Sequence, residues 1–273
     1  MKVEQAKQIA SNAIEQLRQA LEAGHSERLK EYLAAMARFR RYSCGNVMLI
    51  ASQKPNATHV AGFHAWHKLS RFVKKGEKGI LIFAPIIRKK AENNDEIEPD
   101  ESSSAVGFRA AYVFDVTQTD GQPLPEIGSV NGDPREYRDR LAKFVADQGI
   151  ALEYSDEIAP ARGMSQGGKI TLLPGQSSAE EFATLAHEIA HEMMHRDERR
   201  SSTTKRVRET EAEAVAFVVC SAIGLETGSA AQDYIGLYDG DAKLLSESLE
   251  YVQRTSTQIL NALGPDDFSP SPA

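Results

Sequence analysis

The sequence predicts an α+β protein of two domains, and three observations support this fold class. The chain has 273 residues, which is room for two domains of ordinary size. Hydrophobic residues make up 41% and charged residues 26%, as is typical of globular proteins. Helical and strand-like patterns occur on both sides of a segment rich in glycine and proline, residues 118–134. This segment is the predicted linker between the domains.

The N-terminal half is predicted to combine helices with a short sheet. Apolar residues recur at helical spacing over residues 3–23 and again over 26–38. A short helix, AWHKLSRFV, is followed by a buried strand, ILIFAPII, which we expect to pair with AVGFRAAYVFDV. The connecting residues 92–104 carry six acids and no base, which predicts an exposed and partly disordered loop.

The C-terminal half is predicted to be mainly helical. Ser177 or Ser178 is the expected N-cap of its central helix, and Glu180 and Glu181 in the first turn suit the positive end of the helix dipole. The predicted elements are a helix over 135–148, a strand over 150–155, a glycine-broken strand or hairpin over 163–175, a helix ending near His195, and helices over 207–225 and 242–263.

These patterns predict a domain over residues 1–125, a second over 133–264 and a disordered tail over 265–273. No run approaches 18 apolar residues, and the first residues lack the apolar core of a signal peptide. The only two cysteines, Cys44 and Cys220, are too few for a disulfide framework. We therefore expect a cytoplasmic protein with no membrane partner.

The segment 183-ATLAHEIAHEMMH-195 contains the pattern H-E-x-x-H, formed by His187, Glu188 and His191. Residues four apart on a helix lie about 40° apart on adjacent turns, so both imidazoles can reach one ion. Glu188 is close enough to hold a water molecule without binding the ion itself. The ordinary alternative is an amphipathic helix with exposed histidines, but burying His187 and His191 uncoordinated is costly. We therefore predict a Zn²⁺ site. His195 could support a ligand, but we expect it at the helix end, where a partial positive charge is favourable.

A catalytic zinc site needs a third protein ligand, and the segment ETEAEAVAFVVC provides the favoured one, Glu209. Glu213, four residues on, is expected to hydrogen-bond a ligating histidine. Glu211 is an alternative ligand, although it points about 200° away from Glu209. Asp197 is another, at the position used in H-E-x-x-H-x-x-G-x-x-H/D sites, but Met194 replaces the glycine that such a turn needs.

These residues predict a zinc-dependent metalloendopeptidase. Zinc polarises a carbonyl and lowers the pKa of a water molecule to about 7, and Glu188 acts as the general base. The glycine-broken strand ahead of the helix is the expected edge on which an extended peptide lies. Tyr234 is the candidate oxyanion stabiliser, with Tyr238 as a second, although the ordinary role of either is packing.

A basic segment in the N-terminal half predicts binding of single-stranded DNA. Residues 28–90 hold 14 Lys and Arg against two acids, whereas the whole chain has a net charge of −7. Aromatic residues are interleaved with these cations, as in proteins that stack splayed bases. The ordinary alternative is a solvated basic face over aromatic core residues. The candidate DNA-binding residues are Arg38, Arg40, Arg41, Tyr42, Trp66, Lys68, Arg71, Lys74, Lys75 and Lys78.

The chain also resembles a known family. The run GNVMLIASQKPNATHVAGFHAWHKLSRFVKKGEKGILIFAP, together with YVFDVTQTDGQPLPE, resembles the N-terminal domain of ArdC-type antirestriction proteins. HEIAHEMMH followed by ETEAEAVAFVVC is similar to their C-terminal metallopeptidase domain, which is related to ImmA/IrrE-type peptidases. The acidic residues 92–104 belong to no motif of this resemblance.

The resemblance implies a single-stranded DNA-binding domain followed by a zincin-like metallopeptidase domain of the gluzincin type. It implies His187, His191 and Glu209 as zinc ligands and Glu188 as the base. It also implies carriage on plasmids and other mobile elements and protection of incoming DNA from restriction. The peptide or protein substrate is undefined. Two alternatives stay open: a DNA-protecting protein whose zinc site is structural or vestigial, and a repressor-cleaving peptidase whose basic half binds protein.

Overall fold

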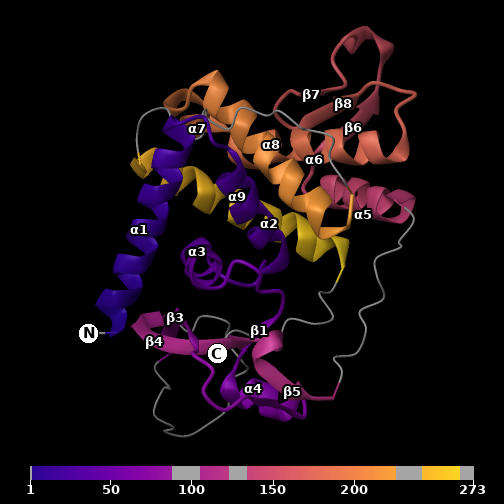
Figure 1. Ribbon diagram of the computed structural model, residues 1–273. Helices are drawn as coiled ribbons and strands as arrows, with labels where there is room; N and C mark the ends of the chain where they lie inside the picture. Colours follow the sequence, from indigo (N-terminus) through magenta and orange to yellow (C-terminus); the bar gives the residue numbers. More distant parts are fainter. Residues whose placement is uncertain (1, 88–104, 123–133, 226–241, 265–273) are drawn as a thin grey trace, which may run out of the picture. The chain divides into compact units, whose positions relative to one another are not determined.

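The computed structural model describes residues 2–87, 105–122, 134–225 and 242–264 (Figure 1). The predicted acidic loop, Tyr234, Tyr238, the predicted tail and most of the predicted linker lie outside these residues. The chain divides into two compact units, each with its own sheet. The mixed α+β class predicted from the sequence is confirmed.

The first unit is built on an antiparallel sheet of strand order β1-β4-β3. The predicted pairing of ILIFAPII with AVGFRAAYVFDV is confirmed, with Leu81 opposite Tyr112. Leu81 packs in one cluster with Ala6 and Leu49. The elements are β1 (Val60–Gly62), α4 (Phe63–Lys68), β2 (Arg71–Val73), β3 (Ile80–Ile87), β4 (Ala105–Asp115), η1 (Val116–Gln118), β5 (Thr119–Gly121), and parts of α1 (Lys2–Glu22) and α3 (Cys44–Gln53).

A buried carboxylate fixes the corner at which β4 ends. Asp115 Oδ1 accepts hydrogen bonds from the backbone N–H groups of Thr58 (2.8 Å) and His59 (3.2 Å). Its Oδ2 accepts from the N–H (3.0 Å) and the hydroxyl (2.6 Å) of Thr117. Burial raises the pKa of Asp115, but these hydrogen bonds outweigh it, so the pKa is lowered overall. The folded state therefore favours the ionised form of Asp115.

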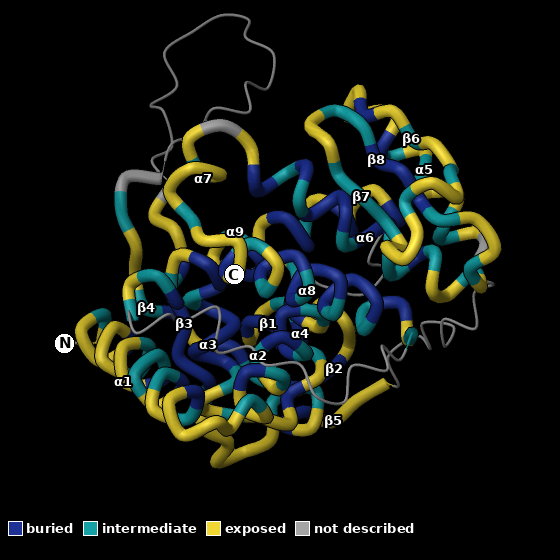
Figure 2. Tube along the Cα trace, turned by 90° about the horizontal axis from the view of Figure 1, so that it is seen from above, coloured by how far each residue is buried: buried dark blue, intermediate teal, exposed yellow. Residues whose placement is uncertain are grey.

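The second unit is a helical layer beside a three-stranded sheet of order β6-β8-β7. Helix α8 packs against α2, α6 and α9, and nine of its 18 residues are buried (Figure 2). Strand β6 runs parallel to β8, whereas β7 is antiparallel to β8 and lies at the edge. The elements are α2 (Glu27–Arg38), α5 (Pro134–Asp147), β6 (Ala151–Tyr154), η2 (Asp156–Ile158), β7 (Gly163–Ser165), β8 (Lys169–Leu172), α6 (Ser178–Met194), α7 (Asp197–Ser202), α8 (Lys205–Ala222) and α9 (Ala242–Leu263).

The compact units differ from the predicted domains in the placement of residues 14–47. These residues cluster with the second unit, although the sequence assigned them to a domain over 1–125. The reason is the apolar face of α2, whose Leu29, Leu33 and Met36 are fully buried in a helix that packs against α8. The position of the linker therefore predicted a division of the chain that hydrophobic packing does not follow. Within the described residues, none of the helices combines the length and the apolar character that spanning a membrane requires.

Replacing Asp115 by Asn should destabilise the first unit by about 1–3 kcal/mol at pH 7, because the charged acceptor is lost. Because the pKa of Asp115 is lowered in the folded state, the ionised carboxylate contributes its full stabilisation above the unfolded-state pKa of about 3.9. This contribution is lost as the pH falls through the pKa of the folded state. The difference between wild type and Asp115→Asn should therefore shrink on acidification. Fluorescence of Trp66, the single tryptophan, reports urea unfolding of this unit.

The matched control is Asp120→Asn, because the Asp120 carboxylate is largely exposed and lies 3.5 Å from Lys74 Nζ. This change should alter the free energy of unfolding by less than about 1 kcal/mol. Equal effects of the two substitutions, or a pH-independent difference at position 115, would contradict the role given to Asp115.

Candidate metal centre

Helix α6 presents the histidines because its start and its apolar face are both fixed. Ser177 and Glu180 form a reciprocal capping box at the N-terminus, as expected for a Ser N-cap. Phe182, Leu185 and Ile189 are fully buried and hold the helix in the core. His187 and His191, one turn apart, remain partly accessible.

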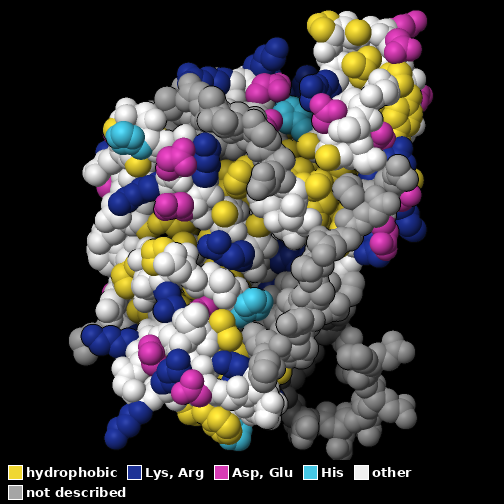
Figure 3. Space-filling view, turned by 45° about the vertical axis from the view of Figure 1, so that its right-hand side comes forward, with side chains coloured by type: hydrophobic (Ala, Val, Ile, Leu, Met, Phe, Trp, Pro, Cys, Tyr) yellow, Lys and Arg dark blue, Asp and Glu magenta, His cyan; other side chains and the backbone are white. Residues whose placement is uncertain are grey.

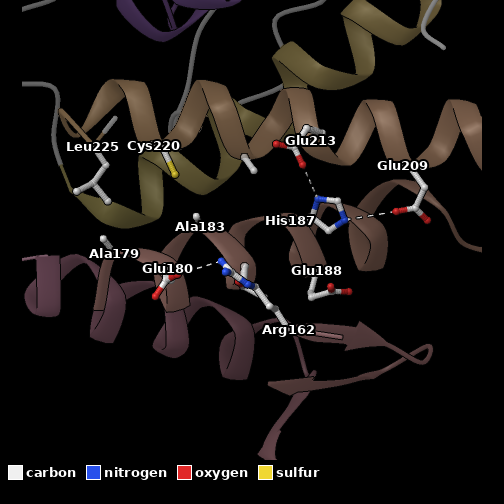
Figure 4. A pocket seen from close by; sticks show the side chains of 13 residues that line it. Arg162, Ala179, Glu180, Ala183, His187, Glu188, Glu209, Glu213, Cys220 and Leu225 are labelled. Carbon is white, nitrogen blue, oxygen red and sulfur yellow. Dashed lines mark ion pairs between the residues drawn. The ribbon is translucent and has the colours of Figure 1, made fainter. Parts of the chain in front are cut away.

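Three side chains converge between α6 and α8. His187 Nε2 lies 3.1 Å from His191 Nε2, and Glu209 Oε2 lies 3.6 Å from each of these nitrogens. Among the described residues, ligand atoms of His187, His191 and Glu209 all lie within 4.8 Å of one another and form a group able to hold a metal ion. Figure 4 shows the ring of His187 between Glu209 and Glu213 on the facing helix.

The hydrogen-bond partners of the two rings show that this group fits a cation. His187 Nδ1 lies 3.4 Å from Glu213 Oε2, and His191 Nδ1 lies 2.9 Å from His195 Nδ1. A carboxylate can only accept, so Glu213 favours a proton on Nδ1 of His187 and leaves Nε2 with a lone pair. The lone pairs of the two imidazoles and the Glu209 carboxylate then point at one another. Their mutual repulsion is relieved only when a divalent cation or protons lie between them.

The titration of the site reflects this crowding of donors and charge. Burial lowers the pKa of His187, but the Glu209 and Glu213 carboxylates outweigh it and raise that pKa to about 9. The pKa of Glu209 is lowered, first by its hydrogen bonds to His187 and His191. Burial raises the pKa of Glu188, and the two imidazoles oppose this. In the absence of a cation, protons therefore hold the site together, and a metal ion must displace them.

Glu188 lies beside the three candidate ligands without joining them. It lines, with His187 and Glu209, a cavity of about 500 Å³. Strand β7 passes directly over it: a Cβ at Gly163 would stand 2.8 Å from both Cγ and Oε1 of Glu188 and 2.7 Å from Cγ2 of Thr184. Only glycine lets the backbone of the edge strand approach this closely. The carboxylate is thus covered by the edge strand and faces the cavity that the ligands share.

A second buried carboxylate fastens the β7–β8 hairpin to α6. Glu192 accepts hydrogen bonds from Ser165 Oγ (2.5 Å), Gly167 N (2.8 Å), Gly168 N (2.7 Å) and Arg196 (2.5 Å). Burial raises its pKa, but these donors lower it to about 2. The ionised Glu192 therefore fixes the hairpin, and with it the position of β7 over Glu188.

The predicted ligands come together as the sequence suggested, and the alternative Glu211 does not join them. Glu211 lies on another face of α8 and bonds His195 Nε2 at 2.8 Å. Asp197 begins α7, and its side chain lies outside the described part of the chain. Glu213 contacts His187, as expected of a supporting residue. The assignment of His187, His191 and Glu209 as ligands stays a prediction.

The sequence missed the pairing of His195 with Glu211, both of which are fully buried side chains. Burial lowers the pKa of His195, an effect that Glu211 opposes, so the ring favours its neutral form. The expectation of a partial positive charge at the helix end does not fit this buried position. One signal for the pairing was present, because His195 continues the four-residue spacing of His187 and His191.

Three of the predicted DNA-binding residues instead serve the core. Trp66 is 1% exposed and donates from Nε1 to the Phe114 carbonyl at 2.8 Å. Arg71 is buried against Thr119, to which Nε donates at 2.9 Å, and Tyr42 is also buried. A buried ring has no free face for a base, so Trp66 and Tyr42 are corrected to packing residues and Arg71 to an internal donor.

The remaining basic candidates lie in both units. Arg40 is partly buried and donates to the carbonyls of Leu260 (2.9 Å) and Gly264 (3.3 Å), at the end of α9. On the face shown in Figure 3, cations are interspersed with acids and form no single patch. Arg38, Arg41, Lys68, Lys74, Lys75 and Lys78 are exposed. The first unit also exposes Phe63 (53%) and Phe72 (55%), aromatic residues of the same basic segment.

Comparison with known proteins bears out the resemblance stated from the sequence. Residues 4–114 match the family model described as the N-terminal domain of anti-restriction factor ArdC. The fold is similar to the metal-free crystal structure of antirestriction ArdC protein from the R388 plasmid, with a TM-score of 0.55 and 22% identity over 93% of this chain and 97% of that one. The Mn(II)-bound structure of that protein gives a TM-score of 0.55 and 19% identity, covering 95% and 99% of the two chains.

A curated relative in Bacillus anthracis, an uncharacterised protein, is 24% identical over 287 residues. The match covers 87% of this chain but 48% of the relative, so the chain spans about half the length of the curated protein that it matches. Residues 4–114 thus match the model of an ArdC N-terminal domain, and the fold of the chain is similar to that of the R388 protein over nearly its whole length.

Substitution of Gly163 by Ala should displace β7 from α6 and destabilise the second unit by about 1–3 kcal/mol, because the added Cβ has no room beside Glu188. Urea unfolding followed by circular dichroism at 222 nm measures this. Gly45→Ala is the matched control, because a Cβ there meets nothing within 4 Å and the residue lies in helix α3. Equal stability of Gly163→Ala and wild type would contradict the close approach of the strand.

Proposed function

We propose that the chain is a zinc-dependent peptidase of antirestriction type whose first unit binds single-stranded DNA. The observation that carries the peptidase proposal is the convergence of two imidazoles and one carboxylate, each within 3.6 Å of another, beside a carboxylate that is not a ligand. A structural zinc site is normally closed by four protein ligands, whereas three leave a position for the reactants. Two imidazoles and a carboxylate are a donor set that zinc favours, and this supports zinc over manganese.

When bound to His187, His191 and Glu209, the cation would supply a Lewis acid that polarises a peptide carbonyl and acidifies a water molecule. Glu188 accepts the proton of that water and passes it to the leaving amine. The raised pKa of Glu188 suits this exchange, because a carboxylate of very low pKa returns a proton poorly. Glu213 keeps the ring of His187 turned toward the site.

An extended peptide has a natural place beside β7. Among the described strands, β7 pairs only with β8, so one of its edges is unpaired. A cavity of about 260 Å³ is lined by Gly163, Met164 and Ser165 of this strand, and by the candidate ligands and Glu188. A peptide added as a further strand would hydrogen-bond this edge and bring its backbone carbonyl to the site. Recognition through the backbone favours an unfolded or extended protein segment as substrate.

Binding of single-stranded DNA is supported by the ArdC-type N-terminal domain and by the surface of the first unit. Phe63 and Phe72 expose more than half of their surface, and both rings lie against histidines of α4, Phe63 against His64 and Phe72 against His67. Exposed rings of this kind stack on bases in proteins that bind single strands without sequence preference. The exposed side chains of Lys68, Lys74 and Lys75 supply phosphate contacts nearby in the chain.

The antirestriction role is drawn from the relatives. The R388 protein is called an antirestriction protein, and the N-terminal family model is that of an anti-restriction factor. The rival function is a protein that protects DNA by binding alone, with a structural or vestigial metal site. Glu188 argues against a structural site. It lies beside the candidate ligands without being one of them, and a purely structural metal site needs no such carboxylate.

Substitution of Glu188 by Gln should lower the rate of peptide hydrolysis at least 100-fold, because the amide cannot accept a proton. Zinc binding, measured by calorimetry, should stay within about threefold of wild type. Glu209→Gln is the matched comparison and should weaken zinc binding instead. Full antirestriction activity of Glu188→Gln in cells, with zinc retained, would show that proteolysis is not how the protein acts.

Replacement of Phe63 or Phe72 by Ala should weaken binding of an oligothymidylate about tenfold each, the loss expected for one stacked base. Fluorescence anisotropy of a labelled strand measures the affinity. Ile86→Ala is the control, because it removes an exposed aliphatic side chain from the same unit. If the affinity for the strand does not change when Phe63 or Phe72 is replaced, or when the salt concentration rises, this surface is excluded as the DNA site.

A further inference from the structure

A buried chain of polar groups continues from the candidate metal ligand His191 into the core of the second unit. It runs through His195 and Glu211 to Arg199 and Ser248. We propose that His195 and Glu211 are positioning residues that set the proton order of His191 and thereby present its Nε2 lone pair to the cation. This inference rests on the proposed metal site, but not on peptide hydrolysis.

The direction of the hydrogen bonds is set at the far end of the chain. Glu211 Oε1 accepts from Ser248 Oγ at 2.6 Å and from the Arg199 guanidinium. Both partners donate, so Oε1 of Glu211 acts only as an acceptor. Its other oxygen, Oε2, lies 2.8 Å from Nε2 of His195. That nitrogen must therefore carry a proton and donate it.

The proton order then passes through His195 to the metal site. With its proton on Nε2, the ring of His195 offers the lone pair of Nδ1 as an acceptor. His191 Nδ1, at 2.9 Å, must donate to this lone pair and therefore carries the proton. The Nε2 atom of His191 is left unprotonated, and this atom lies 3.1 Å from Nε2 of His187 and 3.6 Å from Glu209. One carboxylate thus fixes the tautomers of two rings.

Burial makes this order strict. The side chains of His195 and Glu211 are both 0% exposed, so water cannot replace either partner. A nitrogen or oxygen left unpaired in this position would lose its hydrogen bond without gaining one to water. The other ligand is held differently, because Glu213 is partly exposed and stands 3.4 Å from Nδ1 of His187. The two histidines of the site are therefore supported by separate carboxylates of one helix, at different depths.

Substitution of Glu211 by Gln tests the proton order directly. In this variant, Arg199 and Ser248 donate to the single amide oxygen at position 211, and the NH₂ group of that amide then faces Nε2 of His195. This nitrogen must now accept, so the tautomers of both rings reverse and Nε2 of His191 becomes protonated. Long-range ¹H–¹⁵N NMR spectra of the metal-free protein should show Nδ1–H on His191 and Nε2–H on His195 in wild type, and the opposite in Glu211→Gln.

The same variant should raise the dissociation constant for Mn(II), measured by calorimetry, by 10- to 100-fold. His195→Phe should give a similar loss, and the double variant should lose no more than either single one, because both break one chain. Glu213→Gln acts on the other ring, so its effect should add to that of Glu211→Gln. Val215→Ala, buried on the same helix, is the control for stability: it should lower the unfolding midpoint with unchanged Mn(II) affinity.

Each arm can overturn the inference. Unreversed tautomers in Glu211→Gln, additive losses for Glu211→Gln and His195→Phe, or Mn(II) affinity within twofold of wild type would each do so. Wild-type protein that binds no Mn(II) would overturn the metal site and this inference together. Mn(II) binding with the predicted losses, but no peptide hydrolysis, would leave the positioning role standing and remove only the peptidase.

Discussion

The second unit depends on the close packing of α6 against α8. Helix α8 faces its neighbours with small buried residues, among them Ala212 and Ala216, and short side chains let two helix backbones approach. This contact brings Glu209 to the two histidines of α6. Without this contact, the H-E-x-x-H segment would offer two imidazoles but no third ligand, and Glu188 would not lie beside a complete metal site.

Three alternate acids of α8 hold three different positions around this contact. Glu209 reaches the shared Nε2 atoms, Glu213 supports His187, and Glu211 turns into the core toward His195. On the other side of α6, Gly163 and Glu192 hold the edge strand against the helix. The site is thus supported from both faces of α6 by groups that do not themselves react.

The sequence was informative wherever a short-range period fixed the geometry. Helical spacing was enough to place His187 and His191 side by side, and two strand-like runs joined by the acidic loop predicted the β3–β4 pairing. It failed where long-range packing decides. Trp66 and Phe72 carry the same local pattern, yet Trp66 is buried and Phe72 is exposed, because their neighbours in space differ. The same holds for residues 14–47, which the linker position placed in the first domain and whose apolar face packs in the second unit.

The most direct test of the central claim is the anomalous-scattering map of a crystal grown with zinc. The account predicts one ion at Nε2 of His187, Nε2 of His191 and a carboxylate oxygen of Glu209, with Glu188 unliganded. Coordination by Asp197 or Glu211 in place of Glu209, or an ion absent from α6, would contradict it.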